Sequence, residues 1–393
     1  MKSVICFLIS VLIMLTFASC SVFPFDLKDF YRGGKTSNDG EEKYPPLEKY
    51  LVAENELIEI DGAMFAYVVY DYVGQYGSYM SQQGYNPNLG LLNQTTNYTS
   101  GGTTMTWYKY FCNLAESTLA EYVSFASAQL AKLAEEKGGA ITIDEALTKD
   151  DKDEIDDYMK ELKDYACSSG YGEVNKFLSA VYTPGVTEAS FIRFLKIEAL
   201  AYAYVEDYLD SLEYTDDQLL TYCNNNENID INELSYASQD VRHILFKVDT
   251  TLKGTALEKA FDKAKAEAEK VLEEYNKGDK TAEKFGELAK EHTDDSNGED
   301  GGLYENVLKG QMVEEFENWI YDEARVAGDV DLVKTDYGWH IMYYVGEGKT
   351  AWKVTAEKGL KNEDYEKHLE ELKEKYELEY DYEAMFISLG GKM

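Results

Sequence analysis

The fold is decided by three segments of the chain, VRHILF (Val241–Phe246), DGGLYENVLKGQMVEEF (Asp300–Phe316) and KTDYGWHIMYYVGEG (Lys334–Gly348). Branched and aromatic residues fill the first and the third segment, which is typical of β-strands. A turn at Asp336-Tyr337-Gly338 joins two strands at the third segment. The strands predicted from these segments are 240–247, 331–334 and 339–345.

Helical patterns fill the chain between these strands. Thr255-Ala256-Leu257-Glu258 has the form of a capping box, and it opens a helix to about Asn276 that Gly278 terminates. Two shorter helices are expected, at 281–290 and 312–321. The resulting order, roughly β-α-α-β-α-β-β, predicts an α+β domain over 237–348.

Together, the quoted segments resemble the parvulin family of peptidyl-prolyl cis/trans isomerases, in the right order and over the whole of such a domain. The resemblance implies an antiparallel four-stranded sheet flanked by helices. It also implies an enzyme that rotates X-Pro peptide bonds and needs neither a cofactor nor a metal ion. The partners that it implies are unfolded or newly secreted proteins with X-Pro bonds.

The resemblance assigns catalytic positions to five polar residues. His243 in HILF and His340 in GWHI match the paired central histidines of the family. Asp295 in HTDDS matches a position that is Cys in some parvulins and Asp in others, and Thr335 and Tyr337 match the polar turn before the second histidine. Neutral histidines on adjacent strands can share a hydrogen bond and fix each other's tautomer.

The same resemblance assigns Leu303, Met312 and Phe316 to the apolar pocket for the proline ring. The four-residue spacing predicts Met312 and Phe316 on one helical face. Taken singly, each would be interpreted as an ordinary core residue. The family's usual Gly-Asp-Leu-Gly is Gly301-Gly302-Leu303-Tyr304 here, and the loop that follows is one residue longer. Because 249–256 lacks a cluster of basic residues, a preference for phosphorylated Ser-Pro or Thr-Pro is not expected.

The N-terminus has the features of a secretion leader. Lys2 precedes an apolar run at Val4–Phe17, which is too short for a good membrane span. Phe17-Ala18-Ser19-Cys20 resembles a bacterial lipobox, which implies cleavage before Cys20 and lipidation of its thiol. We therefore expect a leader at 1–19, a flexible tether at 20–47 and a location on the outer face of the bacterial cytoplasmic membrane. The alternative is an ordinary signal peptide that ends near a cysteine.

Helical periodicity dominates residues 48–236. Alternation at Glu56–Asp61 predicts a short strand, and the Gly/Asn/Thr-rich stretch Gly84–Thr103 predicts a loop. Thr215-Asp216-Asp217-Gln218 predicts the capped start of a short helix. The acidic run Asp150–Asp157 suits a helix N-terminus, with a calcium-binding role as the alternative. The other helices are expected at 63–80, 105–137, 151–167, 172–179 and 187–212.

The segment 349–393 holds an apolar helical stripe and then a strand-like alternation at Leu378–Tyr382. The stripe consists of Tyr365, Leu369, Leu372 and Tyr376. Elements this amphipathic need a partner surface. More loosely, the helical region resembles the N-terminal domain of PrsA-type foldase lipoproteins and of SurA chaperones. That resemblance implies a helical chaperone domain at 48–236 on which 349–393 packs, and a homodimer is compatible with it.

The chain of 393 residues carries a formal net charge of −36. This charge argues against nucleic acid as a partner, because phosphate binding needs a surplus of Lys and Arg. It also argues against charge-driven docking on anionic lipid headgroups. We interpret the acidic surface as solubilising, with weak binding of divalent cations or of basic clients as the alternative. The 5 cysteines do not predict a disulfide framework, and no Cys/His spacing predicts a metal site.

The leading interpretation is a membrane-anchored extracytoplasmic foldase, which binds unfolded secreted proteins and isomerises their X-Pro bonds. One alternative is a holdase chaperone whose inactive parvulin domain serves only to bind clients. A second alternative is the solute-binding lipoprotein of a transporter. That class expects alternating βαβ lobes, which the long helical half does not supply.

Overall fold

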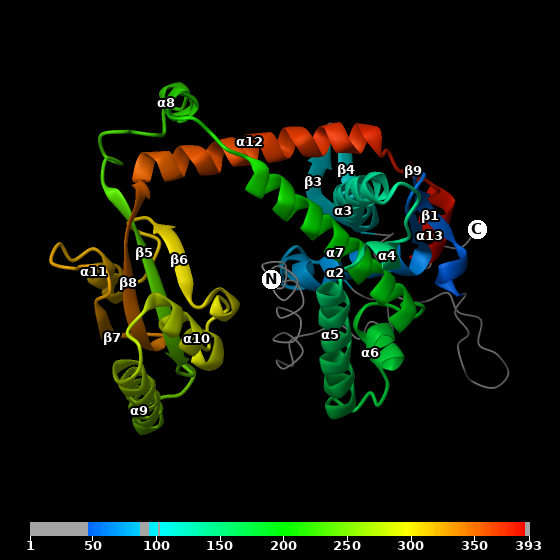
Figure 1. The fold of residues 1–393 in the computed structure, drawn as a ribbon. Helices are drawn as coiled ribbons and strands as arrows, with labels where there is room; N and C mark the ends of the chain where they lie inside the picture. The colour runs from blue at the N-terminus through cyan, green and yellow to red at the C-terminus, as the bar shows by residue number, and fades with distance from the viewer. Residues whose placement is uncertain (1–45, 87–93, 101–102, 390–393) are drawn as a thin grey trace. The chain divides into compact units, whose positions relative to one another are not determined.

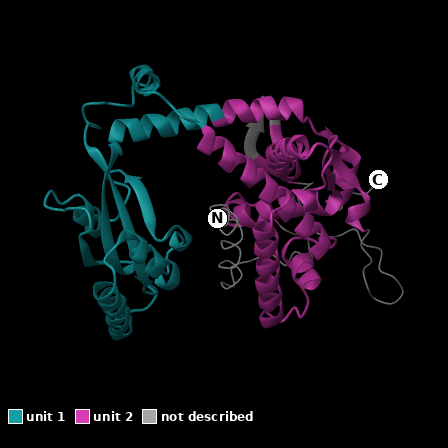
Figure 2. Ribbon diagram, viewed as in Figure 1, with its two compact units in different colours: residues 1, 212–364 teal, residues 2–211, 365–393 magenta. Residues whose placement is uncertain are grey.

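The computed structural model describes residues 46–389, apart from 87–93 and 101–102. The predicted leader, tether and lipidated Cys20 lie outside the described residues. The described chain divides into two compact units, which Figure 2 colours separately. Unit 1 is Leu212–Asp364, and unit 2 consists of 46–211 together with 365–389. Each unit has apolar cores of its own.

Unit 1 contains a four-stranded sheet. Its strands are β5 (Ala237–Lys247), β6 (Leu303–Val307), β7 (Val330–Thr335) and β8 (Gly338–Thr350). They lie in the order β6-β5-β8-β7, and each neighbouring pair is antiparallel. The two long strands β5 and β8 therefore run side by side in the centre (Figure 1). The predicted antiparallel four-stranded sheet is confirmed.

Helices cover both faces of this sheet. They are α9 (Thr255–Lys277), α10 (Ala282–His292) and α11 (Glu314–Ile320). On one face, α9 and α10 pack against a core that includes Ile244 of β5 and Ile341 of β8. On the other face, Phe316 of α11 packs with Val241 of β5 and Met342 of β8. Because successive residues of a strand point to opposite faces, each central strand supplies both cores.

Unit 1 extends beyond the predicted isomerase segment, 237–348, at both ends. The added elements are α8 (Asp216–Asn225) and the first half of α12 (Ala351–Lys375), a helix that continues into unit 2. Leu219 and Cys223 of α8 form a small buried cluster with Ala356 of α12. The predicted capping box at the start of α8 is confirmed, because the Thr215 side chain accepts a hydrogen bond from the main-chain N–H of Gln218.

Two local predictions in unit 1 are wrong. The N-cap of α9 is Gly254, not Thr255, and its φ of 57° lies in the left-handed region that glycine adopts without strain. Met312 precedes α11, because the backbone of Val313 is extended and the helix begins at Glu314. Met312 and Phe316 therefore do not share a helical face, although both pack in the same apolar core.

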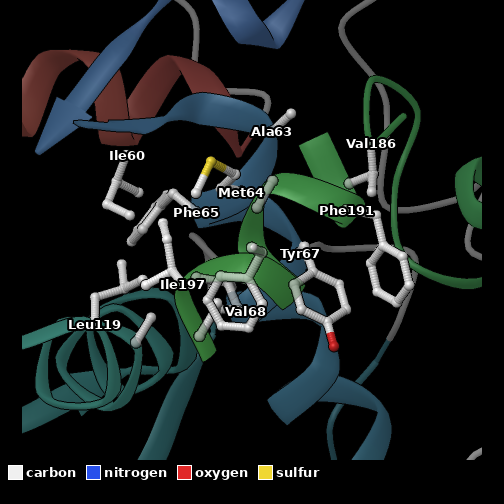
Figure 3. Close-up of a cluster of buried hydrophobic side chains, with 14 of the residues drawn as sticks. Ile60, Ala63, Met64, Phe65, Tyr67, Val68, Leu119, Val186, Phe191 and Ile197 are labelled. Carbon is white, nitrogen blue, oxygen red and sulfur yellow. The ribbon is translucent and has the colours of Figure 1, made fainter. Parts of the chain in front are cut away.

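Unit 2 is mainly helical. Its helices are α2 (Gly62–Gln82), α3 (Trp107–Lys137), α4 (Ile143–Ala146), α5 (Lys149–Ser168), α6 (Val174–Val181), α7 (Glu188–Ser211), the end of α12 and α13 (Tyr382–Ser388). Asp61 caps α2, accepting hydrogen bonds from the main-chain N–H groups of Ala63 and Met64. Figure 3 shows the core where Tyr67 of α2 faces Phe191 of α7, with Leu119 of α3 at the opposite side of the view.

The C-terminal segment contributes to unit 2. The short strands β1 (Leu51–Glu54), β2 (Glu59–Asp61) and β9 (Glu379–Tyr380) form a sheet in the order β2-β1-β9. Leu369, Leu372 and Met385 are buried in the same core as α2 and α3. The strand predicted at Leu378–Tyr382 is shorter than expected, because the Asp381 carboxylate caps α13, which begins at Tyr382.

The loop predicted at Gly84–Thr103 is wrong in part. The strands β3 (Thr95–Ser100) and β4 (Thr103–Thr106) pair antiparallel there. Threonine is β-branched and favours extended backbone, and threonines occur in both strands. Two short 3-10 helices complete the described elements, η2 (Leu47–Lys49) and η5 (Gly298–Asp300). Over the described ranges, no helix has both the length and the apolar character that crossing a membrane requires.

Candidate active site

Two histidines meet on one face of the sheet of unit 1. His243 on β5 pairs in register with Met342, and His340 on β8 pairs with Leu245, so the two side chains are diagonal neighbours. Their Nδ1 atoms lie 3.0 Å apart, and their rings are stacked with an interplanar angle of 19°. Both residues are buried, with exposed fractions of 3% and 5%. We call this pair the histidine dyad.

Asp295 binds the outer nitrogen of His243. Its Oδ2 lies 2.7 Å from His243 Nε2. The loop that carries Asp295 is fixed to β5, because the Thr293 hydroxyl accepts from the main-chain N–H of Leu245 and the Asp294 carboxylate accepts from that of Lys247. The hydrogen bond with His243 is the main cause that lowers the pKa of Asp295 to about 2. Asp295 is therefore ionised at neutral pH.

Thr335 binds the opposite end of the dyad. Its hydroxyl oxygen lies 2.9 Å from His340 Nε2 and accepts a hydrogen bond from the main-chain N–H of Tyr337 at 3.1 Å. The Tyr337 carbonyl accepts a hydrogen bond from the main-chain N–H of Val248. Tyr337 is 55% exposed, so in this turn its main chain supports the dyad while its side chain faces solvent.

When both rings are neutral, one arrangement of protons satisfies every hydrogen bond of the dyad. The Asp295 carboxylate can only accept, so His243 donates from Nε2 and accepts at Nδ1. His340 then donates from Nδ1 and accepts at Nε2 from the Thr335 hydroxyl. Burial, with a contribution from His243, lowers the pKa of His340 to about 4, which keeps that ring neutral at pH 7.

A proton added to the dyad at Nδ1 of His243 reverses the bond between the rings. His340 then accepts at Nδ1 and donates from Nε2 to Thr335. Thr335 serves both states because a hydroxyl group donates and accepts. Proton shifts are therefore enough to reverse the bond between the two rings and the bond between His340 and Thr335, while His243 keeps donating to Asp295.

An aromatic wall lies beside the dyad. The Phe316 ring meets both imidazoles edge to face, with centroid distances of 5.4 Å to His243 and 5.7 Å to His340. Met312 is half-buried against the same apolar core. The buried imidazoles, the phenyl ring and the thioether together offer apolar contact next to a few directed polar atoms, which is the composition of a small-ligand site.

The sheet register separates Leu303 from the other predicted site residues. Leu303 pairs with Arg242 on β5, whereas Tyr304 pairs with Val241, which lies in the core of the Phe316 face. Directly paired residues share a face of the sheet, so Tyr304 lies on the face of the dyad and Leu303 on the other. The structure thus brings together His243, His340, Asp295, Thr335 and Phe316, with Met312 in the same core, and it does not bring Leu303 to them.

Tyr304 is the site residue that the sequence did not predict. Its hydroxyl donates a hydrogen bond to Asp295 Oδ2 at 2.9 Å, and its ring lies 5.3 Å from that of His243. In the sequence, Tyr304 stands where the family's usual Gly-Asp-Leu-Gly motif ends in glycine, and nothing in that pattern predicts a role for it in the site. Gly302, two residues earlier, is required by geometry: its φ is 69°, and a Cβ there would collide with the His243 carbonyl oxygen.

Metal ligation is not part of this geometry. Among the side chains that the structure describes, no group of three or more His, Cys, Asp or Glu is placed to hold a metal ion. Cys112, Cys167 and Cys223 are free thiols, and only Cys167 is exposed. The groups available to a substrate are therefore the dyad, its hydrogen-bond partners and the apolar wall.

Comparison with known proteins shows several similarities. Residues 243–346 match the family model of the rotamases, described as a PPIC-type PPIase domain. Foldase protein PrsA of Staphylococcus epidermidis is 38% identical over 118 residues, which are 29% of this chain and 34% of that protein. The chain therefore spans about a third of the length of the curated relatives that it matches.

One solved structure similar to this chain is PrsA from Bacillus subtilis, which is 22% identical. The match covers 75% of this chain and 89% of that chain, with a TM-score of 0.34. For PrsA from Bacillus anthracis the identity is 20%, the coverages are 58% and 91%, and the TM-score is 0.24. Overlays with TM-scores this low carry no argument about function. The family match over residues 243–346 confirms the family predicted from the sequence. These residues are a PPIC-type peptidyl-prolyl isomerase domain, the parvulin type.

Proposed function

We propose that this chain is a foldase that catalyses cis/trans isomerisation of X-Pro peptide bonds at the histidine dyad. The observation that carries this proposal is the continuous chain of hydrogen bonds from Asp295 through both imidazoles to Thr335, beside the Phe316 ring. It lies within the segment that matches the isomerase family. In the proposal, His243, His340, Asp295, Thr335 and the main chain of Tyr337 form the polar floor, and Met312 and Phe316 hold the proline ring.

The physical task of such a site is to favour a twisted amide. Rotation about a peptide bond has an uncatalysed barrier of ~18–20 kcal/mol, and X-Pro bonds isomerise in tens of seconds or longer. In the twisted state the amide loses its resonance, so the carbonyl loses dipole and the nitrogen becomes pyramidal. An apolar wall that grips the ring and excludes water disfavours the planar ground state relative to the twisted one. Polar groups placed for the rotated carbonyl add to this difference, and no covalent bond to the enzyme forms.

The helical part of the chain belongs to the same proposal. Residues 48–236, completed by the C-terminal segment 349–393, hold unfolded or newly secreted proteins, and residues 237–348 isomerise their X-Pro bonds. Supporting this division, β9 pairs with β1, and Leu369, Leu372 and Met385 are buried in the core of unit 2. A homodimer of the chain is part of the proposal, and sedimentation equilibrium tests it.

The location is proposed from the N-terminal sequence. Lipidation of Cys20 anchors the chain on the outer face of the bacterial cytoplasmic membrane, with 20–47 as a tether. Acyl chains contribute about 0.8 kcal/mol of membrane affinity per buried CH₂, so several chains on one residue hold the protein firmly. Cys20→Ala is expected to release the protein into the medium. Membrane retention of the variant at the wild-type level contradicts the anchor.

One experiment tests the proposed function against the holdase alternative. The wild-type chain and the double variant His243→Ala/Met312→Ala are compared for isomerisation of a proline peptide and for suppression of aggregation of an unfolded client. We expect the variant to lose isomerisation and keep suppression. A wild-type chain that suppresses aggregation but does not accelerate isomerisation is a holdase. A variant that isomerises as fast as wild type rules out the proposed site.

A further inference from the structure

Tyr304 is attached to the dyad at two points. It lies on β6, and its hydroxyl donates to Asp295 Oδ2 at 2.9 Å. That oxygen is also the one that His243 Nε2 approaches at 2.7 Å. The Tyr304 ring lies against the His243 ring, with centroids 5.3 Å apart and an interplanar angle of 40°. Tyr304 thus contacts the acid and the imidazole that the acid binds.

The proposal deepens the proposed function and rests on it. We propose that Tyr304 is a positioning residue for prolyl isomerisation: its hydroxyl holds Asp295 as an ionised acceptor in one place, and Asp295 in turn holds the dyad in one tautomeric state. Tyr304 does not reach the reacting bond itself in this role. It acts through Asp295, and the second donor on Oδ2 completes a chain of hydrogen bonds that runs from Tyr304 to Thr335.

The direction of this effect follows from charge. A hydroxyl group that donates to a carboxylate stabilises the ionised form, and Tyr304 is one of the groups that lower the pKa of Asp295. Burial, followed by the nearby Asp295 charge, raises the pKa of Tyr304, so its hydroxyl keeps its proton and stays a donor. An ionised Asp295 cannot donate, which obliges His243 to carry its proton on Nε2.

The carboxylate also gains a fixed position. The Thr293 hydroxyl accepts from the main-chain N–H of Asp295, and Oδ1 of Asp295 accepts from that of Ser296. These bonds hold the loop and the other carboxylate oxygen, but Oδ2 faces the dyad. Hydrogen bonds to charged groups are among the stronger ones in proteins. Loss of the Tyr304 hydroxyl therefore leaves His243 as the main directional constraint on Oδ2.

The test uses Tyr304→Phe in the whole chain, which removes the hydroxyl and keeps the ring against His243. The matched control is Tyr321→Phe, because the Tyr321 hydroxyl donates at the same distance, 2.9 Å, to the main-chain carbonyl of Val307, also on β6. We expect Tyr304→Phe to lower kcat/KM for a proline peptide about tenfold, which corresponds to about 1.4 kcal/mol. Tyr321→Phe is expected to stay within about twofold of wild type. Equal effects of the two substitutions overturn the proposal.

A double-mutant cycle separates positioning from simple support of the fold. If Tyr304 acts through Asp295, Tyr304→Phe changes kcat/KM less than about twofold in the background of Asp295→Ala. Losses that multiply in the double variant overturn the proposal. Nitrogen-15 spectra of the imidazoles give a readout that does not need activity. We expect wild type to show His243 protonated at Nε2 and His340 at Nδ1, and Tyr304→Phe to show mixed states.

These readouts also separate this proposal from the proposed function. A wild-type chain with no isomerase activity contradicts the proposed function. In that case the imidazole spectra by themselves still decide whether Tyr304 positions Asp295 and the dyad. Spectra of Tyr304→Phe that match those of wild type overturn the positioning role. Spectra that change in Tyr304→Phe and not in Tyr321→Phe support it.

Discussion

Thr335→Val is the substitution that tests the dyad most economically. Valine has nearly the shape of threonine, so it removes the hydroxyl without opening a cavity. Thr335 is 3% exposed, and its hydroxyl serves two groups, His340 Nε2 at 2.9 Å and the main-chain N–H of Tyr337 at 3.1 Å. His340 is itself 5% exposed, so water cannot easily replace the lost donor at Nε2.

The magnitude follows from that unsatisfied nitrogen. Leaving a buried polar group without a partner costs about 1–3 kcal/mol. The main-chain N–H of Tyr337 also loses its acceptor, but this adds little to the cost because water can reach the turn. We therefore expect unit 1 to lose about 1–3 kcal/mol of unfolding free energy. We expect kcat/KM for a proline peptide to fall at least about tenfold, since about 1.4 kcal/mol of transition-state stabilisation is one factor of ten. Thr335→Ser keeps the hydroxyl and is the matched control, expected within about threefold of wild type.

Two measurements check this prediction. Exchange spectroscopy on a proline peptide gives the isomerisation rate without a coupling protease, and urea unfolding followed through the amide signals of β8 gives the stability of unit 1. Thr335→Val with an unchanged rate and an unchanged urea midpoint would refute the hydrogen-bonded dyad as the working part of the site.

Three further predictions concern pH and the core of unit 2. Because the pKa of His340 is lowered to about 4, this ring should stay neutral from pH 8 down to about pH 5, so no loss of kcat/KM in that range should come from protonation of His340; nitrogen-15 spectra that show His340 protonated at pH 6.5 contradict this. Burial raises the pKa of Glu198 to about 7, so the stability that protonated Glu198 contributes to unit 2 is full below the ordinary pKa of a glutamate and is lost as pH rises through 7. Glu198→Gln should therefore flatten the decline of the melting temperature of unit 2 between pH 5 and 8, as calorimetry would show. Met385 is 1% exposed, so Met385→Ala should destabilise unit 2 by about 2–5 kcal/mol and leave the isomerisation rate of unit 1 unchanged, and an unaltered melting temperature would contradict the docking of the C-terminal segment.

The sheet and its two histidines were predictable because they depend on short-range rules. Branched and aromatic residues in VRHILF and in Trp339–Val345 favour strands, and strand periodicity then sets which side chains share a face. The quoted motifs added the pairing of His243 with His340, which no local pattern contains. The capping box at Thr215 was predictable for the same local reason, since its donor and acceptor lie three residues apart.

The missed features depend on contacts between distant residues or on backbone geometry. Tyr304 joins the site only because β6 pairs with β5 in a register that places Tyr304 opposite Val241 and its hydroxyl beside Asp295. The motif alone would assign Leu303 to the site, but the same register turns Leu303 to the other face. Gly254 rather than Thr255 is the N-cap of α9, and the backbone of Gly254 has a positive φ of 57°. The capping-box pattern concerns side-chain hydrogen bonds and does not predict this backbone conformation.

The most direct measurement is the cis/trans exchange rate of a proline peptide in the presence of the whole chain, read by nuclear magnetic resonance. His243→Ala removes the central member of the dyad, and His292→Ala, at the end of α10 and outside the dyad, is its control. We predict that wild type and His292→Ala exchange the peptide far faster than the uncatalysed tens of seconds, and that His243→Ala falls at least about tenfold below them. A wild-type chain that leaves exchange at the uncatalysed rate, or a His243→Ala variant as fast as wild type, contradicts catalysis by the dyad.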